Sequence, residues 1–375
     1  MTPRSSNHTV ASIAQALSGE LLGDATLRVS DIAHVGDVAE PTVLALAMAK
    51  GDIAKLSLSR AKIAVVARGA SVPPGILDAY IAVPRPRIAL CLLTRLFDRP
   101  VTAPPGNHVT AVVDPSAVIG ANVSIGAFAR IGANASIGDG SILMAHVTIG
   151  ADAVVGRDCL FHPGARIGER VRVGDRVIVQ MNAVVGADGF SFVPPQPGAV
   201  ETAKATGQVG GSNAGVQRVN SIGTVVLHDE VEIGPCSTID RATIAATVIG
   251  RGTKLANMVT VAHNCTIGEN CMISGHVGIA GSSTIGNRVV LGGQVGISDH
   301  IRVGDDSIVA AKAKVIRDVP PKSVMMGVPA APRSEFFAQQ LREARMTRYF
   351  GQVDALARRI AAIEGKMRDS GGIGR

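Results

Sequence analysis

Two histidines and a glycine are spaced so that a repeating fold would bring them together. His263 lies in the string VAHNCTIG, Gly281 follows 18 residues later, and His300 follows 37 residues after His263. Histidine is the side chain best suited to remove a proton near neutral pH. The N–H of a glycine, with no side chain in the way, can approach a developing oxyanion closely. The set therefore predicts acyl transfer to an amine.

The spacing of the other reactive residues gives no support to a metal centre or a covalent intermediate. Zinc sites commonly include two histidines a few residues apart, and no pair in this chain has that spacing. The five cysteines are odd in number and include no CxxC pair, which favours a reducing compartment without disulfides. No serine or cysteine occupies a nucleophile motif. We therefore expect no metal site and direct attack by the substrate amine.

The elements that would position these residues follow from a period of six. From Val113 to Val185 every sixth residue is bulky and apolar, thirteen in a row, and glycine follows nine of them. A second register from Ile249 to Val315 contains twelve more. Neither a 3.6-residue helix nor an alternating strand produces a strict six. The repeat predicts a mainly β fold, a parallel β-helix of hexapeptides.

Each hexapeptide is interpreted as one short strand and a turn, so that three of them form a triangular coil of about 18 residues. The aliphatic residue points inward and stacks on its equivalent about 4.8 Å away. Glycine and small residues fill the corners, where a larger side chain would clash. On this basis His263, the Gly281 backbone and His300 share one outer face within about 10 Å along the axis. His276 follows His263 by less than a full coil, so we place it on another face with a structural role.

Three regions depart from the repeat. Residues 187–221 are rich in Pro, Gly, Ser and Asn and predict a long excursion from the coil. A smaller slip lies between Ile239 and Ile249, where ten residues replace six. The predicted domains are a small α/β domain over 1–105, the β-helix over 106–325 and a helical extension over 326–375. Within the first domain we expect helices at 8–19 and 86–97 and strands at 27–35 and 61–67.

Composition excludes several classes of protein. The net charge is only +7, from 37 Lys and Arg against 30 Asp and Glu, and aromatic residues make up 3% of the chain. Because no aromatic residues are interleaved with the basic ones, we expect no nucleic-acid partner. There is no run of 18 apolar residues and no signal-peptide core at the N-terminus, so we expect a cytoplasmic protein without a membrane segment.

Five strings, in order, resemble the UDP-3-O-(3-hydroxyacyl)glucosamine N-acyltransferases of lipid A synthesis. They are GADGFSF (186–192), VEIGPCSTIDRATI (231–244), GTKLANMVTVAHN (252–264), GIAGSSTIG (278–286) and GGQVGISDH (292–300). The resemblance implies a left-handed coil, a homotrimer with sites between subunits, and nucleotide-sugar recognition by the domain at 1–105. It implies transfer of a 3-hydroxyacyl chain from acyl carrier protein, which carries it on phosphopantetheine, to the 2-amine of UDP-3-O-acylglucosamine. No further cofactor is implied.

The resemblance also implies a role for individual residues. His263 would be the general base, Gly281 would supply the oxyanion N–H, and His300 and Asn257 would position the substrate. The residues implied in substrate binding are Asp188, Gly189 and Phe190 near the sugar and acyl chains, and Arg317 near the phosphopantetheine arm. The C-terminal residues 333–375 contain nine Lys and Arg against five Asp and Glu, a local charge of +4. This basic helix is expected either to be solvated and packed on the end of the coil or to dock the acidic carrier protein.

Two departures from the family pattern leave alternatives open. Ala256 stands where the family commonly has an aspartate that orients the histidine, and Asp240 or Asp299 is the candidate replacement. The stretch LALAMAKGD (44–52) has no aromatic ring to stack on uracil. The alternatives are a related acyltransferase that uses another amino-sugar nucleotide or acyl-CoA, and a catalytically weak paralogue or scaffold.

Overall fold

The computed structural model describes residues 8–49, 51–327 and 333–370. It divides the chain into two compact units, Met1–Thr102 and Ala103–Arg375. Parts of the predicted N-terminal domain and C-terminal extension, at residues 1–7, 50, 328–332 and 371–375, lie outside the described residues.

The first unit is an α/β layer structure. Its main sheet has the order β2 (Glu20–Gly23), β7 (Ala79–Val83), β6 (Ile63–Ala67), β5 (Val43–Ala47) and β4 (Asp31–His34), parallel except for β2. Helices α1 (Val10–Leu17) and α3 (Pro86–Leu96) share one buried cluster with this sheet, and α2 (Asp52–Leu56), with the short 3-10 helix η1 (Val35–Asp37), contributes to a second cluster.

The strand predicted at 27–35 is divided in two. β3 (Arg28–Val29) pairs antiparallel with β1 (His8–Thr9), whereas β4 pairs in parallel with β5. The chain therefore changes sheets at Ser30, which a continuous apolar pattern does not reveal. The helix predicted at 8–19 begins after Thr9, whose hydroxyl accepts a hydrogen bond from the Ser12 N–H at 3.2 Å and caps the first turn.

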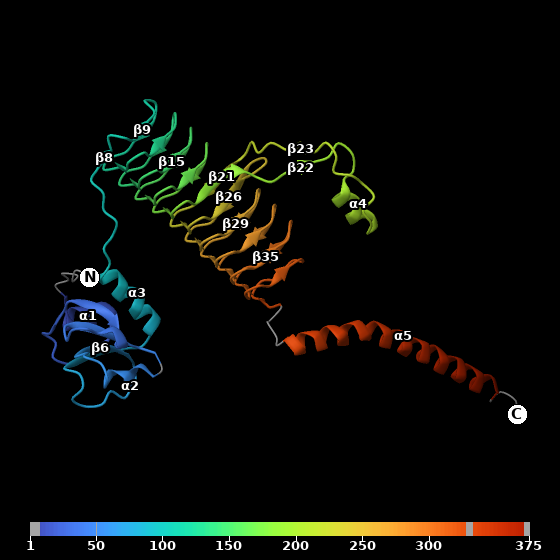
Figure 1. The fold of residues 1–375 in the computed structure, drawn as a ribbon, viewed down its shortest axis with the longest axis horizontal. Helices are drawn as coiled ribbons and strands as arrows, with labels where there is room; N and C mark the ends of the chain where they lie inside the picture. Colours follow the sequence, from blue (N-terminus) through green and yellow to red (C-terminus); the bar gives the residue numbers. More distant parts are fainter. Residues whose placement is uncertain (1–7, 50, 328–332, 371–375) are drawn as a thin grey trace. The chain divides into compact units, whose positions relative to one another are not determined.

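The second unit contains the predicted parallel β-helix, and successive strands pass around three sheets (Figure 1). Sheet 1 contains β8 (Gly106–Asn107), β11 (Ser124–Ile125), β14 (Ile142–Leu143), β17 (Leu160–Phe161), β20 (Ile178–Val179), β25 (Glu232–Ile233), β28 (Lys254–Leu255), β31 (Met272–Ile273), β34 (Val290–Leu291), β37 (Ile308–Val309) and β39 (Val324–Met325). Sheet 2 contains β9 (Val112–Val113), β12 (Arg130–Ile131), β15 (Thr148–Ile149), β18 (Arg166–Ile167), β21 (Val184–Asp188), β26 (Thr238–Arg241), β29 (Thr260–Val261), β32 (Gly278–Ile279), β35 (Gly296–Ile297) and β38 (Lys314–Val315). Sheet 3 contains β10 (Val118–Ile119), β13 (Ser136–Ile137), β16 (Val154–Val155), β19 (Arg172–Val173), β24 (Thr224–Leu227), β27 (Ala246–Ile249), β30 (Thr266–Ile267), β33 (Thr284–Ile285) and β36 (Arg302–Val303).

The period-six residues form the core, as predicted. Partners along a sheet are one coil apart in the sequence, as in the pair Ile119 and Ile137, so each aliphatic side chain stacks on its equivalent in the next coil. All twelve residues of the second register are buried. In the first register, Val113 and Ile119 are only partly buried because the first coil has a neighbour on one side.

Where glycine follows a core residue, the next coil lies close to it. A Cβ on Gly132 would lie 2.6 Å from the Ala151 nitrogen, and one on Gly150 would lie 2.5 Å from the Glu169 nitrogen. The left-handed backbone conformation occurs two residues later, at Asn134 with φ of 54°. The predicted clash at the corners is therefore confirmed, and its cause is close contact between coils rather than an unusual φ at the glycine.

Two insertions interrupt the register. Across the excursion, the Asp175 N–H donates to Asp229 Oδ1, a partner 54 residues later. The equivalent bond in a regular coil joins residues 18 apart, so the excursion adds the length of two coils. It contains its own antiparallel pair, β22 (Phe192–Val193) and β23 (Gln217–Arg218), and the helix α4 (Ala199–Thr206) (Figure 1). Further along, the Val259 N–H donates to Ser237 Oγ at a sequence separation of 22, so the predicted slip lengthens one coil by four residues.

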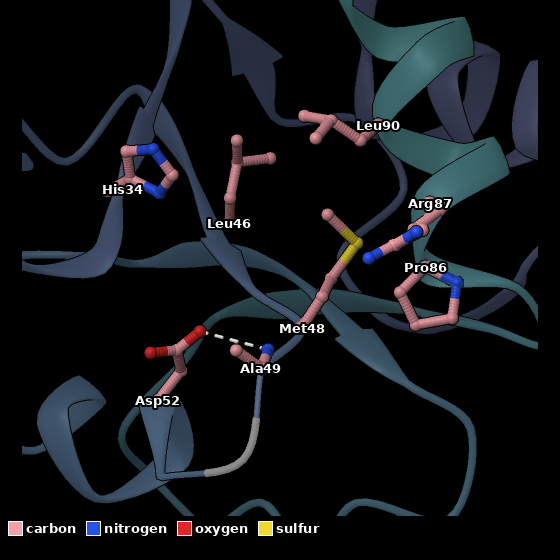
Figure 2. Close-up of a pocket in the computed structure, with 8 residues that line it drawn as sticks. All are labelled: His34, Leu46, Met48, Ala49, Asp52, Pro86, Arg87 and Leu90. Atoms are coloured by element: carbon pink, nitrogen blue, oxygen red, sulfur yellow. Dashed lines mark hydrogen bonds between the residues drawn. The ribbon is translucent and has the colours of Figure 1, made fainter. Parts of the chain in front are cut away.

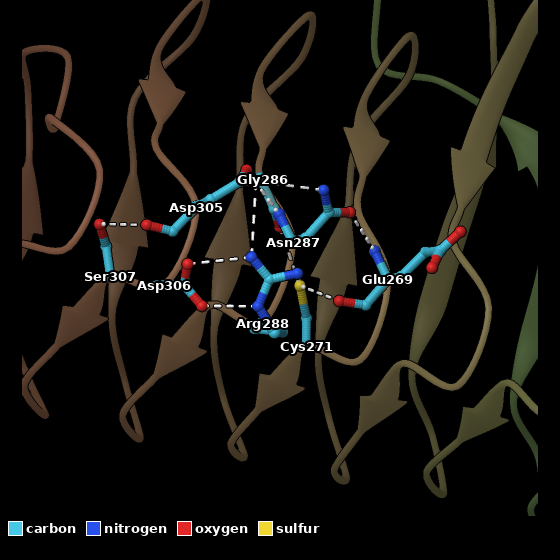
Figure 3. A network of polar contacts seen from close by, with 8 residues as sticks. All are labelled: Glu269, Cys271, Gly286, Asn287, Arg288, Asp305, Asp306 and Ser307. Carbon is cyan, nitrogen blue, oxygen red and sulfur yellow. Dashed lines mark hydrogen bonds and ion pairs between the residues drawn. The ribbon is translucent and has the colours of Figure 1, made fainter.

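The turns that connect sheet 3 to sheet 1 form a polar corner (Figure 3). Asn287 Oδ1 accepts the Glu269 N–H at 2.8 Å, and Asp305 Oδ1 accepts the Asn287 N–H at 2.9 Å. Arg288 binds both carboxylate oxygens of Asp306, at 2.6 and 2.9 Å. Asn287 and Asp305 satisfy turn N–H groups that have no partner in the ladder, and the Arg288–Asp306 pair joins adjacent coils, so this corner serves the stability of the coil.

The described part of the chain ends in the helix α5 (Arg333–Ser370), where helical periodicity was predicted. Among the described helices, none combines the length and apolar character needed to cross a membrane.

Candidate functional site

The turns that connect sheet 2 to sheet 3 stack along one corner of the coil, which we call the His263 corner. It includes the turns at 262–264, 280–282, 298–300 and 316–318. His263 and Gly281 occupy equivalent positions in successive coils, and the Ser282 N–H donates to the His263 carbonyl at 3.0 Å. The His300 N–H donates to the Gly281 carbonyl at 3.1 Å. The structure therefore brings the three residues together at a corner, rather than on the flat face of a sheet.

The imidazole of His263 lies between two glycines. A Cβ on Gly281 would lie 2.8 Å from His263 Cε1 and 3.0 Å from Nε2. On the other side, a Cβ on Gly189 would lie 2.8 Å from His263 Cβ and 2.9 Å from Cδ2. Any side chain at either position would displace the ring. Gly281 comes from the next coil, whereas Gly189 comes from the excursion.

The backbone N–H of Gly281 is available for a ligand. Within the described ranges it donates no hydrogen bond, while its carbonyl is used in the corner ladder. Gly281 therefore lies beside the imidazole edge that contains Nε2, and its backbone has an unused donor. This is the arrangement that an oxyanion site next to a general base requires.

Asn264 determines which nitrogen of His263 carries the proton. Asn264 Oδ1 accepts the Thr243 N–H at 3.0 Å, and its Nδ2 donates to the Ile244 carbonyl at 3.0 Å, so the orientation of the amide is defined by the backbone. His263 Nδ1 is 3.1 Å from the same Oδ1. Because this oxygen can only accept, Nδ1 must donate. Nε2 is then the unprotonated nitrogen of the neutral ring, and it can act as a base.

Replacing Asn264 should test this positioning. We expect Asn264→Ala to lower kcat by about 10- to 100-fold with little change in KM, because the ring loses its fixed tautomer. Asn264→Asp should move the acid limb of the pH–rate profile to higher pH, because a carboxylate favours the imidazolium. Asn134→Ala is the matched control, since Asn134 has the same left-handed conformation at the same corner several coils away. Equal kinetics for Asn264→Ala and Asn134→Ala would contradict the role.

A group of charged side chains surrounds the point where the excursion leaves the coil. Burial raises the pKa of Asp240 to about 6; the charge of His263 acts in the opposite direction, and that of Asp188 raises the pKa further. The buried Arg241 donates through Nε to the Gly186 carbonyl at 2.8 Å, and this nitrogen is 3.7 Å from Asp188 Oδ1. Asp240 thus places a carboxylate close enough for its charge to act on His263, while the hydrogen bond to the ring comes from Asn264. Asp299 instead pairs with Lys204 at 3.6 Å.

The pKa of Asp240 predicts a pH-dependent stability. Since the folded value is about 6 and the ordinary value is 3.8, the folded protein binds more protons than the unfolded chain between these pH values. The free energy of unfolding should therefore fall as pH rises through this window and level off above about pH 6. We expect Asp240→Asn to raise Tm more at pH 7.5 than at pH 4.5, as measured by thermal unfolding. Asp299→Asn, at an exposed carboxylate, is the control; an equal Tm change at both pH values for Asp240→Asn would contradict the prediction.

The excursion places Gly189, which lies between Asp188 and Phe190 in the sequence, against His263. The Gly189 N–H donates to the buried Ser221 Oγ at 3.2 Å, which connects the two ends of the excursion. Phe190 packs edge-on against Phe192, with ring centroids 5.1 Å apart, yet 85% of Phe190 is exposed. The excursion therefore holds an exposed apolar ring one residue beyond Gly189, which contacts His263.

Two predicted site residues do not contact His263 within the chain. Asn257 is in the corner between sheets 1 and 2, where its carbonyl accepts the His276 N–H at 3.2 Å, so it does not meet His263 of the same chain. Ala256 is in this same turn, so an aspartate there would not orient His263 within one chain either. Arg317 is exposed at the His263 corner, two coils beyond Gly281.

Sequence reasoning missed Asn264, Arg241 and Ser221. The only signal for Asn264 was its position directly after the histidine, and the partners of the other two depend on the path of the excursion. Cys265 is excluded as a nucleophile because burial raises its thiol pKa to about 11.

The first unit contains a cavity of about 380 Å³ (Figure 2). Its lining residues are His34, Leu46, Met48, Ala49, Asp52, Pro86, Arg87 and Leu90. Leu46, Met48, Ala49 and Asp52 come from the stretch that the resemblance places at uracil, and none of them is aromatic. Asp52 Oδ2 accepts the Ala49 N–H at 2.9 Å and shapes this end of the cavity.

Comparison with known proteins agrees with the fold and the repeat. The family model described as bacterial transferase hexapeptide (six repeats) matches residues 116–151, 152–187 and 246–281. A solved structure of Arabidopsis UDP-N-acetylglucosamine acyltransferase shares the fold, with a TM-score of 0.50 and 21% identity over 59% of this chain and 71% of that chain.

Two curated relatives extend the agreement to most of the sequence. The UDP-3-O-acylglucosamine N-acyltransferase of Paracoccus denitrificans (strain Pd 1222) is 42% identical over 265 residues, which cover 69% of this chain and 71% of the relative. The enzyme of the same name from Ruegeria pomeroyi is 40% identical over 264 residues, which cover 70% and 72%. The chain therefore belongs to the UDP-3-O-acylglucosamine N-acyltransferase family, and it is an acyltransferase.

Proposed function

We propose that the chain transfers a 3-hydroxyacyl group from acyl carrier protein to the 2-amine of UDP-3-O-acylglucosamine, in the synthesis of lipid A. The observation that carries the proposal is the geometry of His263. Its ring lies between Gly189 and Gly281, its Nδ1 is bound to Asn264, and its Nε2 lies beside Gly281, whose N–H is unused among the described residues. This arrangement suits a base that acts on an amine while an oxyanion forms nearby.

In the proposed step the substrate amine attacks the thioester carbonyl of the donor. A nitrogen–carbon bond forms, and His263 Nε2 removes a proton from the amine. The Gly281 N–H donates to the oxyanion, and Asp240 stabilises the imidazolium electrostatically. The tetrahedral intermediate then collapses with cleavage of the carbon–sulfur bond, and the proton goes from His263 to the phosphopantetheine thiolate. No cofactor beyond that carrier arm takes part.

The other site residues hold substrate in this proposal. Asp188, Gly189 and Phe190 contact the sugar and acyl chains, His300 positions the substrate along the corner, and Arg317 binds the phosphopantetheine arm. Asn257 lies on a different corner, so it can reach a substrate at His263 only from a neighbouring copy of the chain. This placement supports a homotrimer with sites between subunits. The N-terminal domain predicted at 1–105 binds the nucleotide, with the cavity lined by Leu46 and Met48 as its site.

The acidic carrier protein is proposed to dock on the basic α5, and the reaction to take place in the cytoplasm. A second acceptor or donor remains the competing candidate because the cavity wall at 44–52 has no aromatic ring. An aliphatic wall favours stacking on a base less strongly than an aromatic one does. The competing enzyme would acylate another amino-sugar nucleotide or take the acyl group from acyl-CoA.

The test is a transfer assay with purified protein, UDP-3-O-acylglucosamine and two donors, 3-hydroxyacyl-acyl carrier protein and 3-hydroxyacyl-CoA. We expect turnover with the carrier-protein donor and a much lower kcat/KM with the CoA thioester. A preference for CoA would support the competing donor. Turnover only with a different amino-sugar nucleotide would show that the acceptor is not UDP-3-O-acylglucosamine. Absence of turnover with every donor and acceptor pair would overturn the proposal in favour of a scaffold.

A further inference from the structure

A recess lies where the excursion rejoins the coil. Its volume is about 430 Å³, and its lining comes from two neighbouring coils between residues 152 and 172, from the returning end of the excursion at 222–224, and from Ala245 in the lengthened coil. Thr224 joins these parts, because its Oγ1 donates to the Arg170 carbonyl at 2.8 Å and its N–H donates to the Ala245 carbonyl at 2.9 Å. The recess is therefore a product of the two insertions, and the proposed function assigns it no role.

Two exposed arginines line the recess. Arg170 is in the turn at 168–170, and Arg172 belongs to β19, where it pairs with Val154 on one side and Val226 on the other. Within the part of the chain that the structure describes, neither guanidinium forms an ion pair or a hydrogen bond. Arg176, two coil positions further, instead binds Glu230 at 3.1 Å. The recess therefore holds two positive charges that are free to meet a ligand.

The remaining polar groups of the recess favour an anion. Asp152 is the acidic residue of the lining, and its Oδ1 accepts from Asn134 Nδ2 at 3.2 Å instead of pairing with Arg170. The backbone N–H of Ala245 makes no hydrogen bond among the described residues, so it is a further donor. A guanidinium is a planar fork of donors that matches the oxygens of a phosphate group. These groups together suit an anion that has several acceptor oxygens.

Apolar side chains lie beside these charges. Ile222 is 66% exposed and Val154 is 46% exposed, and both line the recess. A free phosphate ion would leave them in water, whereas a ligand that also has an organic part would cover them, as in most ligand sites. We infer that the recess binds the phosphate or diphosphate group of an organic ligand, with Arg170 and Arg172 as its main contacts.

The proposed function supplies two ligands with such a group, and this assignment of the source rests on that function. The acceptor has a diphosphate on the sugar that presents the amine, and the carrier arm has a phosphodiester. The recess is connected to the His263 corner, because Asn264 Nδ2 donates to the carbonyl of Ile244, the residue before Ala245. Both ligands offer the same charged oxygens to the arginines, so the identity of the ligand is decided by kinetics.

Binding of inorganic pyrophosphate to the full chain tests the inference without turnover. We expect calorimetry to show binding to the wild type, and Arg170→Ala or Arg172→Ala to weaken it about 10-fold or more through the loss of charge-assisted hydrogen bonds. Arg172→Lys should recover only part of the affinity, because an ammonium binds phosphate as a point charge. Both arginines are exposed, so the variants should keep the wild-type Tm.

Arg130→Ala is the matched control for these variants. Arg130 is an exposed strand arginine of β12 and does not line the recess, so pyrophosphate should bind this variant as it binds the wild type. Absence of binding to the wild type would overturn the inference. Equal affinity in the wild type, Arg170→Ala and Arg172→Ala, or an equal loss in Arg130→Ala, would overturn it as well.

Steady-state kinetics identify the ligand. If the recess holds the acceptor, Arg170→Ala and Arg172→Ala should raise KM for UDP-3-O-acylglucosamine about 10-fold with little change in kcat, and pyrophosphate should compete with this substrate. A rise in KM for the carrier-protein donor instead would assign the recess to the carrier arm. Loss of pyrophosphate binding with unchanged kinetics for both substrates would assign it to another organic phosphate.

The outcomes separate from those of the transfer assay. Pyrophosphate binding that depends on Arg170 and Arg172 would support the recess even if no donor and acceptor pair gave turnover. Turnover by a protein whose pyrophosphate binding does not depend on these arginines would remove the recess alone and leave the proposed function standing.

Discussion

We expect His263→Ala to lower kcat for acyl transfer by roughly 100- to 10,000-fold, the usual contribution of a general base. The neutral ring has its unprotonated Nε2 beside Gly281 because Nδ1 is held by Asn264 at 3.1 Å. Alanine removes the only group in the described site that is placed to accept the amine proton at neutral pH. Because the half-buried ring makes few packing contacts in the core, the fold should be retained. The rate constant should be measured under single-turnover conditions so that product release does not mask the effect.

A second histidine serves as the control for this substitution. His228 is exposed in the polar corner between sheets 3 and 1, away from the His263 corner. His228→Ala should retain wild-type kcat and KM, and both variants should keep the wild-type Tm. If His263→Ala turned over as fast as wild type, the family activity would stand and the assignment of the base would be wrong. A similar loss in both variants would point to damage to the coil instead.

The second large effect is expected from a single added methyl group at Gly281. In Gly281→Ala the new Cβ would lie 2.8 Å from His263 Cε1 and 3.0 Å from Nε2, closer than carbon and nitrogen atoms pack. The ring must move away from the N–H that is proposed to bind the oxyanion. A displacement of about 1 Å in a catalytic geometry can cost about 100-fold in rate, so we expect a loss of at least that size.

Gly296→Ala is the control that separates this effect on the rate from a general loss of stability, because its added methyl group lies in open space. A Cβ on Gly296, in the sheet that leads to the same corner one coil further, meets nothing within 4 Å. Gly296→Ala should therefore keep both Tm and kcat. The loss in Gly281→Ala should appear in kcat, because the imidazole and oxyanion contacts strengthen in the transition state. Wild-type kcat for Gly281→Ala would show that the His263 ring and this amide do not act together.

The sequence by itself determined the coil and the relation between His263 and Gly281. A strict period of six requires each aliphatic residue to be buried, so counting residues is enough to align one coil with the next. The separation of His263 and Gly281 by one coil could therefore be predicted from the sequence, and the structure places the two residues in adjacent turns. The hand of the coil and the roles of individual residues came from the family resemblance instead.

Only the tertiary structure decided how the histidine is oriented. The resemblance pointed to the turn at 256–257, but this turn lies on another corner, and Asn264 holds the ring. The orientation of Asn264 depends on Thr243 and Ile244, which belong to the lengthened coil. Gly189 likewise reaches His263 from an excursion that adds the length of two coils. A repeat specifies which residues are stacked only while its register continues. Where residues are inserted, the path of the chain and the side-chain hydrogen bonds depend on packing in three dimensions, which residue counting does not contain.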